Sequence, residues 1–128
     1  MTTLIICLAI ATAMPILFKA PLAFAMNQLG GGYDNRHPRA QQSQLSGFGA
    51  RAKAVHENSF EALIMFAPGA LTAIATNQVG NIAQYLAITF VIARFAYALS
   101  YWFDVHILRS SVWFIGFGCS LGLFFVAL

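Results

Sequence analysis

The sequence contains few charged residues. Asp, Glu, Lys and Arg make up only 9% of its 128 residues, whereas 59% are hydrophobic. A soluble domain carries about 25% charged residues, so this composition excludes an ordinary water-soluble fold and predicts an integral membrane protein. The 7 basic residues are spread along the chain. Nucleic-acid binding requires a dense Lys/Arg face, and we therefore exclude that class and expect no nucleic-acid partner.

Cysteine is also scarce. The 2 cysteines, Cys7 and Cys119, stand in apolar surroundings near opposite ends of the chain. They lack the CxxC or Cys–His spacing of zinc and dithiol sites. We interpret both as small buried hydrophobic side chains.

A metal site lacks ligands in this sequence. The segment around His56, Glu57 and Glu61 carries one imidazole and two carboxylates at helical spacing. A non-haem iron centre would need further His or carboxylate ligands at the same depth. The other histidines, His37 and His106, lie in or beside expected loops. We therefore expect no metal.

Long apolar runs are what the sequence has in abundance. A membrane-spanning helix needs about 20 mostly apolar residues, and four segments meet this condition. The first has no basic n-region and is longer than the apolar core of a signal peptide, so we interpret it as a retained span. The expected helices cover about residues 3–29, 49–75, 82–103 and 107–128, with a flexible polar loop over about 30–48. The chain is thus predicted to be all-α, a single domain over 1–128 built as a four-helix membrane bundle.

The loop charges predict the orientation of the bundle. Arg36, Arg39, Arg51 and Lys53 flank the first loop and Arg109 flanks the third, while the second loop and both termini carry no Lys or Arg. Basic loops stay in the cytoplasm. We therefore expect the first and third loops to be cytoplasmic and both termini to be non-cytoplasmic, which requires an even number of spans.

Two helices carry polar faces that need a physical reason. Asn58 and Glu61 share one face of the second helix, and Arg94, Tyr97 and Tyr101 share one face of the third. A charge near the bilayer centre costs roughly 2.5–3.5 kcal/mol, so such residues normally face the bundle interior or a wet cavity. Two interpretations stay open at this point: a buried ion pair between Glu61 and Arg94 with interfacial tyrosines, or a ligand site.

Three short motifs follow one another on the second, third and fourth helices. The matched residues are His56, Asn58 and Glu61, then Arg94, Tyr97 and Tyr101, then Arg109, Ser110 and Trp113. With the chain length, the four spans and the basic first loop, these motifs resemble those of the MAPEG family, the membrane-associated proteins in eicosanoid and glutathione metabolism. The resemblance covers nearly the whole chain and is to a bacterial-type member, which places the protein in a bacterial inner membrane.

The resemblance implies a homotrimer of four-helix protomers that binds glutathione as co-substrate between neighbouring subunits. It implies a glutathione transferase or peroxidase, in which a thiolate attacks a lipophilic small molecule that arrives from the lipid bilayer. We assign Arg109 the catalytic role of lowering the thiol pKa. The residues expected to bind glutathione are Arg51, Lys53, His56, Asn58, Glu61, Arg94, Tyr97, Tyr101 and Ser110.

One position departs from the family pattern. The arginine that normally holds a glutathione carboxylate falls on Ala54, and only Arg51 and Lys53 stand nearby to replace it. Lysine does not form the two-pronged contact that arginine makes with a carboxylate. The departure favours an alternative function, a non-catalytic integral membrane protein that binds lipid or serves as an accessory subunit of a larger membrane complex.

Overall fold

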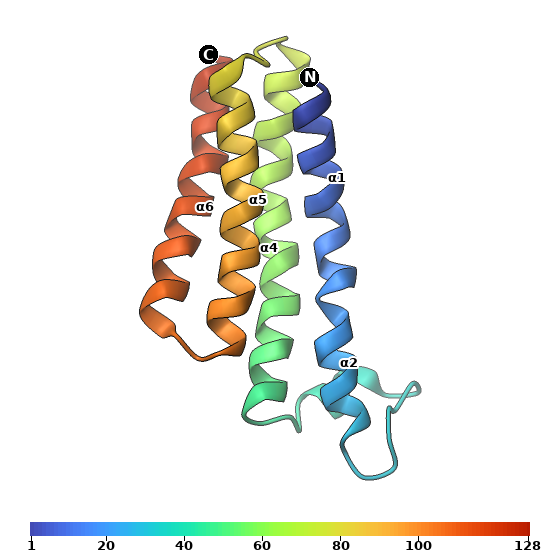
Figure 1. Ribbon diagram of the computed structural model, residues 1–128. Helices are drawn as coiled ribbons and strands as arrows, with labels where there is room; N and C mark the ends of the chain where they lie inside the picture. Colours follow the sequence, from blue (N-terminus) through green and yellow to red (C-terminus); the bar gives the residue numbers. More distant parts are fainter.

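The computed structural model describes residues 1–128 and is all-helical. Its six helices are α1 (Thr2–Leu17), α2 (Lys19–Asn27), α3 (Pro38–Gln42), α4 (Phe48–Ala75), α5 (Asn81–Trp102) and α6 (His106–Ala127). Four segments are long and apolar enough to cross a membrane. They lie side by side as an elongated bundle with both termini at one end and α2 and its following loop at the other (Figure 1). The predicted all-α architecture with four spans is confirmed.

The first span is built from two helices. The sequence predicts one helix over about 3–29, whereas the structure ends α1 at Leu17 and begins α2 at Lys19. Pro21 has no N–H to donate to the carbonyl one turn earlier, which weakens the helix at this point. The backbone of Phe18 stays close to helical, with φ −77° and ψ −5°. The two helices therefore continue in nearly one direction as a span of 26 residues.

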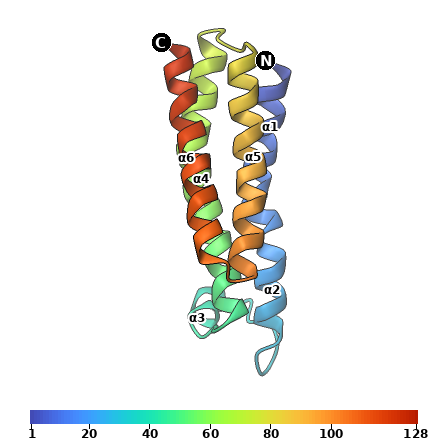
Figure 2. The same cartoon turned by 60° about the vertical axis from the view of Figure 1, so that its left-hand side comes forward.

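The polar loop is held by side-chain hydrogen bonds and is not a plain connector. Gln41 is buried and its Nε2 donates to the carbonyl of Gly32 at 2.8 Å, while its Oε1 accepts from the backbone N–H of Asp34 at 2.9 Å. Pro38 opens the short helix α3, where its missing N–H costs nothing. Figure 2 shows α3 beside the loop-side end of α4. The loop thus packs polar groups against the base of the bundle.

Helix α4 packs against all three other spans, as α5 also does. It runs through Pro68 without ending. Gly69 allows a close approach to α6, because a Cβ atom at this position would lie 2.8 Å from the carbonyl oxygen of Ser120. Below this contact the rings of Phe66 and Phe90 stack with centroids 3.9 Å apart. Close backbone packing through small residues is the usual way that helices associate in lipid.

Candidate functional site

A hydrogen-bonded chain of three polar side chains links α5 to α4 inside the membrane. Nη2 of Arg94 donates to Oδ1 of Asn58 at 2.7 Å, and Nδ2 of Asn58 donates to Oε2 of Glu61 at 2.9 Å. At about 1.5 Å per residue, Arg94 lies about 20 Å along α5 from Asn81, the first residue of this helix. Glu61 lies at a similar depth along α4. Both charges therefore belong to the hydrocarbon region, about 30 Å thick, and not to its surface.

Arg94 occupies a space that small residues leave open. Its side chain is only 2% exposed, and its Cδ lies 3.9 Å from where a Cβ of Gly116 on α6 would stand. The guanidinium lies over the ring of Tyr97, 4.2 Å from the centroid. Its Nε–H is buried and has no hydrogen-bond partner within the chain. A buried charge with an unused donor is rare in proteins and points to a ligand.

Two tyrosines connect this guanidinium to a second one. The rings of Tyr97 and Tyr101 meet edge to face at 5.7 Å, and the guanidinium of Arg109 lies over the ring of Tyr101 at 4.5 Å. A cavity of about 150 Å³ opens at this point. It is lined by Tyr97, Arg109, Ser110, Trp113 and Phe114. One cation, one phenol ring and an apolar wall thus surround one small hollow, which we call the arginine pocket. Arg94 and Tyr101 stand next to it, since Arg94 contacts the ring of Tyr97 and the ring of Tyr101 contacts Arg109.

The structure corrects the expected position of Glu61. The sequence predicts that its carboxylate faces the bundle interior, whereas Glu61 is exposed on the outside of the protomer. It makes no ion pair with Arg94, because Asn58 stands between them and bonds to both. Helical spacing alone predicts a shared face of α4 but not its rotation in the bundle. The interpretation as a direct buried ion pair is therefore wrong.

Two of the predicted basic residues bind elsewhere. Nε of Arg51 donates to the carbonyl of Trp102, near the C-terminus of α5, at 3.3 Å. Nζ of Lys53 pairs with Oε1 of Glu57 at 3.3 Å on the surface of α4. Neither side chain reaches the arginine pocket, so neither takes the place of the arginine that Ala54 lacks.

His56 also faces away from the arginine pocket. Its Nδ1 lies 2.7 Å from the carbonyl oxygen of Pro15 on α1, and since a carbonyl only accepts, Nδ1 carries the hydrogen. The ring meets Phe60 edge to face at 5.2 Å. His56 thus orients α1 against α4.

The sequence interpretation missed two residues at this site, Phe114, which lines the arginine pocket, and Gly116, which leaves room for the side chain of Arg94. Helical spacing offered a signal for Gly116, because it follows Arg109 by two turns with Trp113 between them on the same face. Phe114 lies beside that face and carries no such signal.

The comparisons with known proteins identify a family for the chain. A model of the MAPEG family matches residues 3–128. No curated protein and no solved structure matches the chain.

Proposed function

Because the chain belongs to the MAPEG family, we propose that it is a membrane-bound glutathione-dependent transferase or peroxidase that acts on lipophilic electrophiles. The unpartnered Nε–H of the buried Arg94 carries this proposal. A guanidinium that is 2% exposed and bonded to a single neutral amide has spare capacity for an anion. Glutathione brings two carboxylates to such a site.

The other groups around the pocket suit the rest of the tripeptide. Arg109 supplies a second cation, and the carboxylate of Glu61 is the one nearby partner for an ammonium group. Asn58 and Tyr97 offer an amide and a phenol for the peptide bonds. The residues present therefore fit glutathione, with Arg51, Lys53 and His56 left to structural contacts.

The size of the arginine pocket supports a site shared between protomers. Its volume of about 150 Å³ is below the roughly 300–1,000 Å³ of pockets that enclose a small molecule. Glu61 places a carboxylate on the outside of the protomer at hydrocarbon depth, and a charge there needs a polar cover. We place a neighbouring subunit of a homotrimer over this face, with glutathione between the two.

Glutathione supplies a thiolate as nucleophile. Arg109 stands at the loop-side end of α6, and its positive charge favours the ionised form of a sulfur nearby. Each unit by which it lowers the thiol pKa corresponds to about 1.36 kcal/mol. Tyr101 holds the guanidinium through its ring face. Trp113 and Phe114 form an apolar wall that faces the bilayer and suits a lipophilic second substrate.

The basic residues near the polar loop support an orientation of the protein in the membrane. The loop after α2 and the start of α4 lie at the end of the bundle opposite the termini (Figure 1). This part of the chain carries Arg36, Arg39, Arg51 and Lys53. We place this end in the cytoplasm of a bacterial cell. Labelling of a cysteine introduced at Arg36 with a membrane-impermeant reagent tests this placement. We expect labelling only after the cells are permeabilised, and labelling in intact cells would reverse the orientation.

The activity is tested with purified protein in detergent or lipid nanodiscs. We expect conjugation of glutathione to a model aryl halide or reduction of a lipid hydroperoxide. Arg109→Ala should abolish most of the rate, whereas Arg36→Ala, in the exposed loop, should leave it unchanged. Full activity of Arg109→Ala would reject the thiolate role of this residue.

A non-catalytic function is the second candidate, and one observation favours it. Ala54 stands at the position of the usual arginine. The two nearest basic side chains are already bonded within the chain, Arg51 to the carbonyl of Trp102 and Lys53 to the carboxylate of Glu57. A protein of this kind would bind lipid or join a larger membrane complex. Failure of glutathione to bind, together with co-purification of an unrelated membrane enzyme at fixed stoichiometry, would favour this function.

A further inference from the structure

A second polar hollow lies at the loop-side end of the bundle, apart from the arginine pocket. It has a volume of about 270 Å³ and lies among α2, α3 and α4, and we call it the loop-side pocket. Its lining residues are Lys19, Pro38, Arg39, Gln42, His56, Glu57 and Phe60. It shares none of them with the arginine pocket.

The loop-side pocket lies at the edge of the hydrocarbon region. At about 1.5 Å per residue, Lys19 lies about 26 Å along the first span from Thr2. His56 lies about 29 Å along α4 from Ala75. Since the hydrocarbon core is about 30 Å thick, both residues stand where acyl chains give way to lipid head groups.

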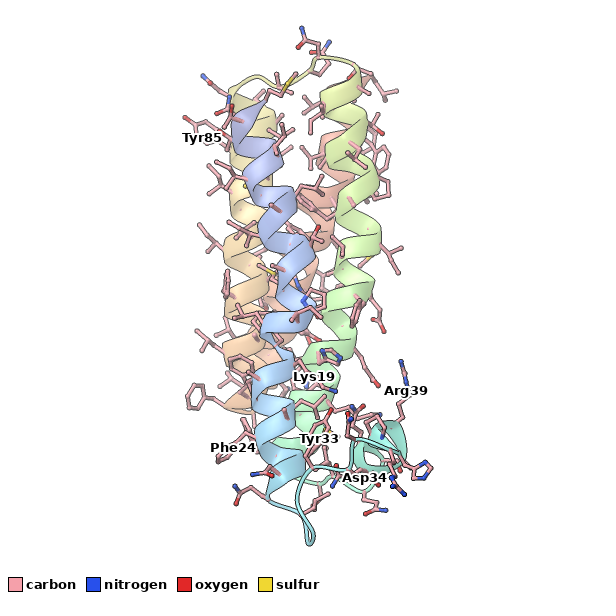
Figure 3. The ribbon with its side chains drawn as sticks, turned by 90° about the vertical axis from the view of Figure 1, so that its right-hand side faces the viewer. Lys19, Phe24, Tyr33, Asp34, Arg39 and Tyr85 are labelled. Atoms are coloured by element: carbon pink, nitrogen blue, oxygen red, sulfur yellow. The ribbon has the colours of Figure 1, made fainter.

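Two positive charges, Lys19 and Arg39, line the pocket, and neither forms a salt bridge within the chain. The one salt bridge joins Lys53 to Glu57. The carboxylate of Glu57, which also lines the pocket, is therefore paired with Lys53 and not with these two cations. Arg39 rises from α3 along the side of α4, and Lys19 projects from α2 at the same side of the molecule (Figure 3). The two cations thus flank a hollow at head-group depth.

The remaining lining residues complete a site for a phosphate with an attached acyl chain. Gln42 offers an amide within the hollow, and the Nδ1–H of His56 is already used by the carbonyl of Pro15. Phe60 is 45% exposed and presents an apolar ring on the bilayer side of the pocket. Basic pockets between spanning helices on the cytoplasmic side are characteristic sites for anionic lipid head groups.

We propose that the loop-side pocket binds the phosphate of an anionic phospholipid through Lys19 and Arg39, with Phe60 against its acyl chain. The glutathione function of the arginine pocket does not depend on this site. A bound lipid would connect α2, α3 and α4, and so fix the polar loop to the spans.

The experiment compares lipids on the intact protein. We expect phosphatidylglycerol in mixed micelles to raise the midpoint of thermal unfolding of the wild type, and phosphatidylcholine to have little effect. Removing one charge near a membrane surface weakens binding about fivefold. Lys19→Gln and Arg39→Gln should each bind phosphatidylglycerol about fivefold more weakly than the wild type, and the double variant should bind it about thirtyfold more weakly. Arg36→Gln, from the same loop but outside the pocket, is the matched control and should bind as the wild type does.

Each other result decides against the proposal. An equal response of the double variant and the wild type would place the lipid elsewhere. Equal stabilisation by inorganic phosphate would make the pocket a site for free anions. Stabilisation by glutathione that disappears in the double variant would assign Lys19 and Arg39 to the thiol site. If Arg39→Gln is unstable without lipid, Arg39→Lys should restore binding within a few fold, and failure to do so would reject a simple charge contact.

Discussion

Arg94 and Asn58 are joined by a hydrogen bond of 2.7 Å between α5 and α4. The same amide passes a second hydrogen bond to Glu61. Asn58 therefore separates a buried cation from an anion on the protomer surface, and it satisfies part of the hydrogen-bonding capacity of each. A hydrocarbon or carboxylate side chain at residue 58 would not do this.

The first prediction concerns this amide. Asn58→Ala removes the only hydrogen-bond acceptor of the Arg94 guanidinium and should lower the free energy of unfolding by about 1–2 kcal/mol. Neutral hydrogen bonds between membrane helices are worth about 0.6 kcal/mol, and a charged donor raises this value. Thermal unfolding in detergent measures the effect. Asn81→Ala, exposed at the start of α5, should change little, and equal effects of the two substitutions would contradict the assignment.

The second prediction concerns the packing of α4 on α6. Gly69→Ala would bring a Cβ atom to 2.8 Å from the backbone oxygen of Ser120, and backbone cannot move aside cheaply. We expect a loss of about 1–3 kcal/mol of stability. Gly118→Ala is the control, since nothing lies within 4 Å of its Cβ position. If Gly69→Ala were as stable as Gly118→Ala, the close approach of the two helices would be wrong.

The third prediction concerns the residue that positions Arg109. Tyr101→Leu removes the ring under the guanidinium, and such a contact is worth about 0.5–2 kcal/mol. The rate with glutathione should fall by roughly 2- to 30-fold, and the pH–rate profile should shift to higher pH as the thiol pKa rises. Tyr101→Phe keeps the ring face and should keep both. A purely structural role would leave the pH–rate profile of Tyr101→Leu in place.

The fourth prediction concerns the ammonium of glutathione. Glu61→Gln removes the negative charge but keeps an oxygen to accept from Asn58, so stability should hold. KM for glutathione should rise roughly tenfold or more, because a charge-assisted hydrogen bond contributes about 1.5–3 kcal/mol. A glutathione analogue without its amino group should bind both proteins equally. If Glu61→Gln prefers glutathione over the analogue as strongly as the wild type does, the ammonium group binds elsewhere.

The architecture was open to prediction because its signals are local. Each span is a long apolar run, and the shared face of Arg94, Tyr97 and Tyr101 follows from helical spacing alone. The family resemblance rests on the same local motifs and is confirmed by the match over residues 3–128. The site residues and the trimer stay predictions.

The partners of individual side chains were not open to prediction in the same way. Arg51 binds the carbonyl of Trp102 and His56 that of Pro15, because the rotation of α4 turns both away from the arginine pocket. That rotation depends on packing across the whole bundle, including the contact at Gly69. The loop-side pocket joins segments that are far apart in the sequence, and no local pattern connects Lys19 to Arg39.

The most direct test of the central claim is calorimetric titration of glutathione into the purified protein in lipid nanodiscs. The account predicts a saturable heat of binding at millimolar or lower concentration, lost in Arg109→Ala and retained in Arg36→Ala. No heat from the wild type at millimolar glutathione, or the same heat from Arg109→Ala, would contradict it.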